Sequence, residues 1–265
     1  MKIDSVLPLL SRTQNKMMLL KIENLVDGLV VKRPSKLIKS PYVADVQLGE
    51  QYILGHAAAL GCCGLSDAGA TILMSPSTSE KCSHTIYLSI HNDQVIGIHP
   101  KLAENLAESA LTTNCLTTLQ NVKSYRKETK INDSRFDFTG IDKNGIPFIM
   151  EVKNVSLTGI GTQNRIAIFP VGNRKKTKEP VSPRAVKHTR ELTLLRKDKE
   201  NIRCIMCYVI QRTDVDAFHT SDLDLEYKEA VKLAHEAGVE IITMVVEWNR
   251  QGEARFIRDD LPFVL

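Results

Sequence analysis

The apolar pattern of this chain changes its period near residue 100, and this change limits the possible folds more than any other feature. Before it, turn formers separate short runs of β-branched and aromatic residues at 29–31, 42–48, 71–74 and 85–90. Short strands at such spacing are typical of a small β-barrel or sandwich. We therefore expect residues 1–98 to form a β-domain, and an OB-like barrel fits the pattern.

Beyond residue 100, helical and extended patterns alternate. The segment 100–111 has Pro100 in its first turn and repeats apolar residues at helical spacing. The same reasoning predicts helices at 184–197 and 225–237 and strands at 134–138, 146–153, 203–211 and 239–247. Alternating helices and strands favour a central mixed sheet flanked by helices. The predicted architecture is therefore α+β, with a second domain spanning 99–265.

Composition and charge narrow the class of protein. Apolar residues make up 43% and charged residues 25% of the chain, as in ordinary soluble globular proteins. No run approaches the roughly 18 apolar residues that span a bilayer, and the first ten residues are too weakly apolar for a secretory signal. We expect a cytoplasmic protein without a membrane partner. The net charge of +4 and the pI near 8.7 are compatible with nucleic-acid binding but do not demand it.

Cys204 and Cys207 have a spacing that is also found in zinc and redox sites. They lie, however, in an apolar run that predicts a strand. Side chains three residues apart on a strand point to opposite faces, so the two thiols would not converge on one ion. We expect both to be buried thiols, reduced in an intracellular chain.

The charges that carry chemistry lie on two predicted strands joined by a polar connection that ends in Asn144-Gly145. Asp137 lies on the first strand, and Glu151 and Lys153 lie on the second, all among apolar neighbours. Charged side chains in a mostly buried strand cost free energy unless they are paired or bind something. Glu151 and Lys153 are two residues apart and therefore project from one face. Asp137 reaches that face if the register of the strands allows it.

Two carboxylates and an ammonium group suit metal-assisted hydrolysis of a phosphodiester. Asp137 and Glu151 offer hard oxygen ligands for Mg²⁺ or Mn²⁺, and such an ion acidifies water. Lys153 would orient the attacking water or stabilise developing charge. The pattern Asp-x13-Glu-x-Lys is the signature of PD-(D/E)xK nucleases. The same spacing alone is also compatible with a buried Glu–Lys pair or a sheet edge whose charges face solvent.

Longer motifs surround this triplet. They are SRFDF at 134–138, EVKNV at 151–155, AIFP at 167–170, KHTREL at 187–192 and VIQR at 209–212. Their order and spacing resemble the SRxDF, EVKNV, AxFPD, KHLREL and VVQR segments of the sugar fermentation stimulation protein A (SfsA) family. The resemblance implies an N-terminal OB-like domain, a C-terminal PD-(D/E)xK-like nuclease domain, and binding and cleavage of DNA, RNA or both. The family name reflects a link to sugar metabolism in bacteria.

The resemblance fails at particular positions. The HxPNTG-like turn of the family reads HAAALG at 56–61 here, and we assign it no binding role. Val171 stands where the family has an Asp after Phe-Pro, which would weaken a second metal site if the family uses that carboxylate. Glu104 and Glu108 on the first predicted helix are available carboxylates or solvated helix residues, and neither matches the family pattern cleanly.

Basic residues gather on one face of the helix predicted at 184–197 and in the loop before it, which suits binding of phosphates. The predicted nucleic-acid contacts are Arg135, Arg174, Lys175, Lys176, Arg184, Lys187, His188, Gln211 and Arg212. The basic loop is also compatible with a solvated surface, His188 with a satisfied, partly buried histidine, and Arg212 with a structural ion pair.

The leading hypothesis is a metal-dependent nuclease that acts on DNA, RNA or both. The alternative is a DNA-binding regulator without turnover, whose phosphate contacts would make its binding salt-dependent. A third class, a sugar- or metabolite-binding regulator, has no cluster of polar and aromatic residues to support it. Aromatic residues make up only 5% of the chain, which disfavours single-strand recognition by stacked bases.

Overall fold

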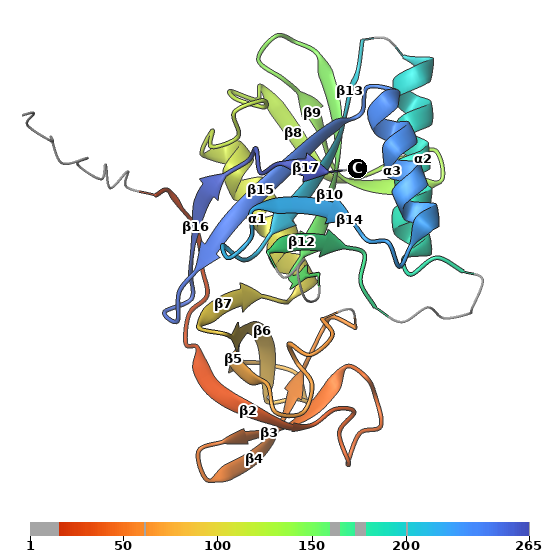
Figure 1. Ribbon diagram of the computed structural model, residues 1–265. Coiled ribbons are helices and arrows are strands. Elements are labelled where there is room, and N and C mark those ends of the chain that lie inside the picture. The colour runs from red at the N-terminus through yellow and green to blue at the C-terminus, as the bar shows by residue number, and fades with distance from the viewer. Residues whose placement is uncertain (1–15, 61, 160–164, 173–178, 200, 265) are drawn as a thin grey trace, which may run out of the picture.

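The computed structural model describes residues 16–60, 62–159, 165–172, 179–199 and 201–264. Figure 1 shows a β-barrel at the bottom of the view and, above it, a sheet with helices packed on it. The barrel is built from the first part of the chain, and the sheet from the rest together with one strand from the N-terminal end.

The barrel is closed by a pairing between strands that are distant in sequence. Its strands are β2 (Val26–Lys32), β3 (Val43–Leu48), β4 (Gln51–His56), β5 (Thr71–Pro76) and β6 (His84–His91), with β7 (Gln94–Gly97) added at the edge. Neighbours pair antiparallel, and β4 meets β6 in parallel through Gly55 and His56. Side chains such as Val30, Val46 and Ile72 fill the interior. The predicted OB-like barrel is confirmed.

The central sheet is mixed, as predicted. Its strand order is β1 (Met18–Lys21), β16 (Glu253–Arg258), β15 (Glu240–Trp248), β13 (Arg203–Ile210), β10 (Pro147–Val155), β9 (Ser134–Ile141) and β8 (Ser124–Ile131). The middle strands β10, β13 and β15 run parallel, and the outer pairs run antiparallel. The parallel strands are covered on both faces, which explains why β13 is almost continuously apolar.

Helices cover both faces of this sheet. Helix α1 (Pro100–Thr112) packs on one face together with Phe138, Met150 and Val246. Helices α2 (Pro183–Asp198) and α3 (Leu225–Glu236) lie side by side on the other face (Figure 1). Cys204 belongs to the α2 side and Cys207 to the α1 side, and both are fully buried. Burial raises the pKa of Cys204 to about 11 and that of Cys207 to about 12, so the prediction of separate, inert thiols is confirmed.

A smaller sheet continues from the end of β10. Its order is β11 (Leu157–Thr158), β12 (Ile166–Phe169), β14 (Ala217–Thr220) and β17 (Phe263–Val264). Phe169 at the end of β12 packs against Tyr208 of β13 and Tyr227 of α3, with ring centroids 6.1 and 5.3 Å away. These aromatic contacts fix the small sheet against the α2 side of the central sheet.

The first described strand departs from the predicted domain assignment. The prediction includes it in the β-domain 1–98, whereas β1 pairs antiparallel with β16 at the edge of the central sheet. Leu19 of β1 is buried in the core that contains α1. The partner of Leu20 is Ala254, and a local pattern does not reveal a partner so far along the chain.

The barrel meets the central sheet at Gly97, the last residue of β7. Ser156 Oγ donates a hydrogen bond to the Gly97 carbonyl (2.6 Å), and the Gly97 amide donates to the Gln211 carbonyl (3.3 Å). Trp248 Nε1 donates to Oε1 of Gln211 (2.9 Å). A side chain at Gly97 would overlap the Gln211 amide and stand 2.7 Å from Trp248 Nε1. Glycine is therefore required for this close approach.

We expect Gly97→Ala to lower the free energy of unfolding by about 1–3 kcal/mol, because the added methyl group must displace the buried Gln211 amide. Urea denaturation of the two proteins measures the change. In a Gln211→Ala background the same substitution should cost less, because the obstructing amide is gone. An equal cost in both backgrounds would contradict this account of the junction.

None of the described helices combines the length and apolar character that a membrane crossing requires.

Candidate active site

The predicted triplet lies where β9 and β10 separate. The two strands pair from Pro147 opposite Ile141 to Met150 opposite Phe138, and the pairing stops there. One residue further, Oδ2 of Asp137 accepts a hydrogen bond from the backbone amide of Val152 (2.7 Å). The carboxylate thus takes the place of a missing strand partner, and this bond holds Asp137 beside Glu151 and Lys153.

Glu151 is almost fully buried and is held by two neighbours. Its Oε1 accepts from Lys153 Nζ and lies 2.6 Å from His188 Nδ1 on α2. Because a carboxylate only accepts, His188 must carry its proton on Nδ1 in this bond. Among the described residues, Oε2 of Glu151 has no hydrogen-bond partner although it is buried. A buried carboxylate oxygen without a partner is costly, and a cation bound beside it would satisfy it.

The two carboxylates differ in their electrostatics. Burial, and then the charge of Glu151, raise the pKa of Asp137 to about 6. Burial also acts to raise the pKa of Glu151, but the charge of Lys153 and hydrogen bonds from His188 and Lys153 outweigh it and hold that pKa below its ordinary value. Glu151 is therefore ionised at neutral pH, and further positive charge beside the pair would favour the ionised form of Asp137.

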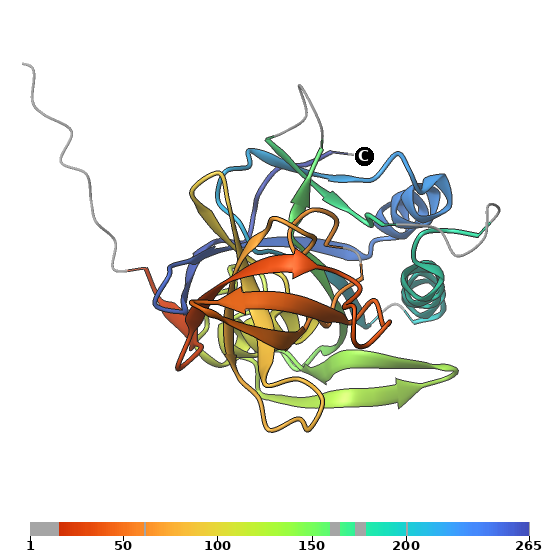
Figure 2. The same cartoon turned by 90° about the horizontal axis from the view of Figure 1, so that it is seen from below.

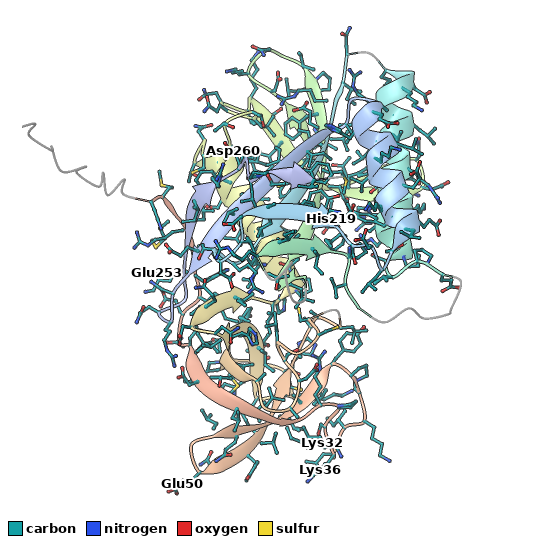
Figure 3. The ribbon with its side chains drawn as sticks, viewed as in Figure 1. Lys32, Lys36, Glu50, His219, Glu253 and Asp260 are labelled. Atoms are coloured by element: carbon teal, nitrogen blue, oxygen red, sulfur yellow. The ribbon has the colours of Figure 1, made fainter. Side chains whose placement is uncertain are left out.

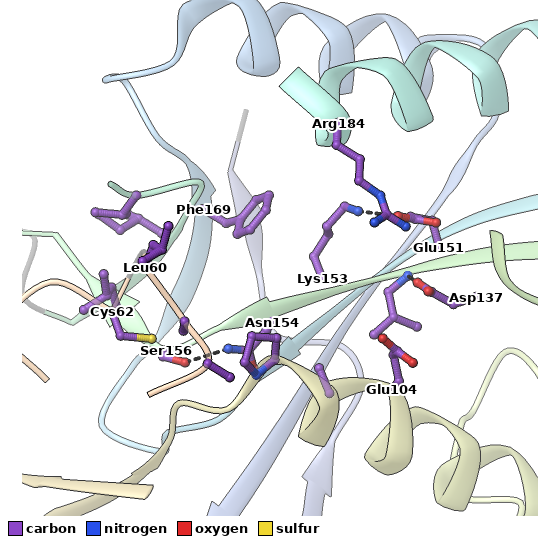
Figure 4. Close-up of a pocket in the computed structure, with 18 of the residues that line it drawn as sticks. Leu60, Cys62, Glu104, Asp137, Glu151, Lys153, Asn154, Ser156, Phe169 and Arg184 are labelled. Carbon is purple, nitrogen blue, oxygen red and sulfur yellow. Dashed lines mark hydrogen bonds and ion pairs between the residues drawn. The ribbon is translucent and has the colours of Figure 1, made fainter. Parts of the chain in front are cut away.

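A cavity of about 390 Å³ opens at this point, between the central sheet and the barrel. Figure 4 shows Asp137, Glu151 and Lys153 at one end, with Glu104 of α1 beside Asp137 and Arg184 of α2 reaching toward Glu151. Two carboxylates from the sheet, one from a helix and two cations thus share one pocket. Such a set can hold a divalent cation and a phosphate group together.

Some predicted nucleic-acid contacts are accessible. Arg135 is mostly exposed and stands 3.6 Å from Glu128 across the β8–β9 hairpin, which extends to one side of the molecule in Figure 2. Arg184 lines the cavity. Lys187 is half exposed, and its Nζ donates to the Asp133 carbonyl (2.8 Å). Of these three side chains, Arg184 is the one that lines the cavity of the candidate site.

Other predicted contacts are buried, which removes them from the surface that a nucleic acid touches. His188 is 4% exposed, Gln211 0% and Arg212 5%. His188 supports Glu151, and Gln211 joins the barrel to the sheet. Arg212 forms a bidentate pair with Asp214 at 2.7 Å, so the structural ion pair is the correct alternative. Polar residue type alone gave no indication of this burial. Arg174, Lys175 and Lys176 lie outside the described residues.

Two parts of the cavity were not predicted as functional from the sequence: Glu104 and a segment of the barrel. Glu104 faces Asp137 (Figure 4), and its charge contributes to the raised pKa of Asp137. The barrel segment Ala58, Ala59 and Leu60, in the altered turn at 56–61, forms part of the wall. The position of Glu104 between the buried residues Ala103 and Leu106 was an available signal, since a carboxylate beside an apolar face approaches the sheet. Nothing local indicated the barrel segment.

Comparison with known proteins identifies the family of this chain. A domain described as "Sugar fermentation stimulation protein RE domain" matches residues 101–252, which is more than half of the chain. The chain belongs to the sugar fermentation stimulation protein family. Its homologue in Pelagibacter ubique is 27% identical over 230 residues, covering 85% of this chain and 91% of the relative. The homologue in Jannaschia sp. is 32% identical over 185 residues, covering 68% and 71%.

A solved member of the family has the same fold. SfsA of Pyrococcus furiosus in complex with Ca²⁺ superimposes with a TM-score of 0.80 at 20% identity, covering 94% of this chain and all of that one. The resemblance drawn from the sequence motifs is thus confirmed for the family and for the barrel-plus-sheet architecture.

Proposed function

We propose that this family member is a metal-dependent nuclease that hydrolyses phosphodiester bonds of DNA, RNA or both. The observation that carries the proposal is the buried Oε2 of Glu151, which has no partner among the described residues and lies in a cavity with Asp137 and Lys153. Glu191, which pairs with Lys187, also has a buried Oε2 without a partner among the described residues. Glu151 differs from it because Glu151 lines the cavity beside a second carboxylate and Lys153.

The donor set fits a hard divalent cation. Asp137 and Glu151 supply carboxylate oxygens, and Asp137 has a raised pKa that a bound cation would lower again. Within the described part of the chain no group of three or more His, Cys, Asp and Glu is arranged to enclose an ion. Mg²⁺ and Mn²⁺ retain waters and take phosphate oxygens beside one or two carboxylates, and Asp137 and Glu151 supply two carboxylates here. The Pyrococcus furiosus SfsA binds Ca²⁺, another cation that prefers oxygen ligands.

The charged side chains of the cavity have distinct roles in the proposed hydrolysis. A bound Mg²⁺ or Mn²⁺ would supply positive charge that polarises the phosphate and acidifies water. Glu151 and Asp137 hold negative charge at fixed positions, and His188 keeps the Glu151 carboxylate in one orientation. Lys153 Nζ donates a hydrogen bond to Glu151, and Lys153 lines the cavity. There it orients water or stabilises charge on the phosphate. Arg184 at the start of α2 binds a neighbouring phosphate oxygen.

Cleavage of labelled DNA and RNA oligonucleotides with Mg²⁺, with Mn²⁺ and with EDTA tests the proposal. We expect products only when a divalent cation is present. Absence of cleavage under all three conditions, with salt-dependent binding retained, would favour the regulator without turnover.

Replacing His188 should weaken the site although His188 does not face the substrate. We expect His188→Ala to lower the cleavage rate about 10–100-fold and to raise the metal concentration needed for half-maximal rate, because Glu151 loses its orienting partner. His188→Asn retains an N–H donor and should recover part of both losses. If both variants change the melting temperature but leave the metal dependence as in the wild type, His188 has only a packing role.

A further inference from the structure

The cavity has two chemically different ends. The charged end contains Asp137, Glu151 and Lys153. The opposite end is mainly apolar, and the polar side chains that line it, Asn154 and Ser156, are hydrogen-bonded to each other (Figure 4). The apolar wall consists of Ala58, Ala59, Leu60, Ile168, Phe169 and Val171. In Figure 4 the Phe169 ring lies between the Leu60 side and the Lys153 side of the pocket. A ligand that fills this cavity must present a charged group to one end and an apolar surface to the other.

The apolar end is open to solvent, and one of its side chains, Phe169, is packed against the protein. Leu60 is 52% exposed, so covering it with an apolar surface is favourable. Phe169 is fixed from behind by Tyr208 and Tyr227. The wall is therefore preformed on the side of the small sheet.

A buried arginine fixes the barrel side of the wall. The Arg33 guanidinium donates to the Ala59 carbonyl (2.6 Å) and to the Pro41 carbonyl (2.7 Å), and it also contacts Ser66. Tyr42, next to Pro41, lines the same cavity. One side chain thus holds both barrel segments that face the charged end, which reduces the ordering cost of binding a ligand there.

We propose that the apolar end accepts the base of a nucleotide that is unpaired and unstacked, adjacent to the phosphate held at the charged end. This inference rests on the proposed nuclease function and names its substrate class: single strands, flaps or unpaired nucleotides rather than intact duplex. A nucleotide joins an anionic phosphate to a flat, largely apolar base, which matches the two ends. A base inside a duplex must first leave its stack and its pair, and this cost disfavours duplex substrates. The low aromatic content of the chain disfavours stacking of many successive bases. It does not disfavour binding of a single base against one apolar surface.

The wall recognises the face of a base and not its hydrogen-bonding edge. Leu60 and Phe169 offer no side-chain donor or acceptor, and Asn154 and Ser156 are engaged with each other, with Gly97 and with Gln211. We therefore expect little preference among the bases. The observable signature is unstacking of the bound base, whatever its identity and the surrounding sequence.

Fluorescence of 2-aminopurine, which rises when the base unstacks, tests the inference without relying on cleavage. The analogue is placed in turn at each position of a single-stranded oligonucleotide and titrated with Asp137→Asn protein in the presence of Mg²⁺, conditions in which the proposed cleavage is slowed. The same titration is made with Asp137→Asn/Leu60→Asn and with Asp137→Asn/Leu37→Asn. Leu37 is a matched control, since it is 81% exposed and follows Lys36 at the far end of the barrel (Figure 3).

We expect a rise in fluorescence in the parent and in the Leu37→Asn protein, at interior positions of the oligonucleotide generally. Leu60→Asn should remove it and weaken binding about fivefold to tenfold. No rise at any position, or an equal rise in the Leu60 and Leu37 variants, would overturn the inference. The wild-type rates of cleavage of single-stranded and duplex DNA are measured separately. Equal rates on the two substrates would overturn the substrate class but would support the nuclease function. Failure of cleavage alone rejects the proposed function and leaves the binding result to decide on the base pocket.

Discussion

Glu151→Gln is expected to lower metal-dependent cleavage by about 10²–10³-fold, the range seen when one fixed electrostatic contact to a transition state is removed. The substitution keeps the shape of the side chain but removes the charge that the cavity holds between Lys153 and His188. Asp137→Asn and Lys153→Met should have losses of similar size, because each removes a charge from the same pocket. The initial rate of cleavage of a labelled single-stranded oligonucleotide with Mg²⁺ measures the effect.

A matched control tests whether removal of a carboxylate outside the cavity also slows cleavage. Glu108 lies on α1 one turn beyond Glu104 and pairs with Lys127 rather than lining the cavity. Glu108→Gln should cleave at nearly the wild-type rate. Rates close to wild type for all three substitutions in the triplet would refute the catalytic assignment.

Asp137→Asn is expected to make the metal-free protein more stable although it slows cleavage. In the folded protein the pKa of Asp137 is about 6, against an ordinary value of 3.8. Between these values the folded chain holds a proton that the unfolded chain has released, so wild-type stability falls as the pH rises through that window. Asn carries no charge, and its carbonyl still accepts from the Val152 amide. The variant should therefore gain up to about 3 kcal/mol well above pH 6 and little near pH 4.

Added metal should offset most of this difference in stability. At about 100 times its dissociation constant, an ion that binds only the folded wild type stabilises it by about 2.7 kcal/mol. The variant, lacking one carboxylate ligand, should gain much less. Urea denaturation at pH 4, 6 and 8, with EDTA or with Mg²⁺, measures both effects. Equal responses of the two proteins to Mg²⁺ would show that Asp137 is not a ligand. A stability difference that does not depend on pH would show that folding does not raise the pKa of Asp137.

Much of the fold was predictable because local periodicity reports which face of an element is buried. The predicted strand 203–211 and helix 184–197 agree with β13 and α2 within one residue at each end. The strands β8, β12 and β14 were not predicted. The β8 sequence is mostly polar and exposed, so it has no apolar alternation. Strands β12 and β14 are only four residues long, which is too short to show a period.

The candidate site was predictable only in part. Glu151 and Lys153 were placed on one face by their spacing, and the structure brings Asp137 to them through the Val152 amide. The depth of His188 was not predictable. His188 follows a basic residue on an amphipathic helix, and whether such a side chain faces solvent or the sheet depends on how the helix is rotated in the packed protein.

The sequence by itself determined the triplet, the family motifs around it and the alternation of elements that supports them, because spacing along one strand or helix is a local property. Only the tertiary structure decided that β9 and β10 part at Asp137, that His188, Gln211 and Arg212 are buried, and that a barrel segment near Leu60 faces the carboxylates. These features depend on contacts between segments distant in sequence, such as the Gln211 backbone with Gly97. Such contacts follow from the packing of whole elements, and a local pattern does not specify them.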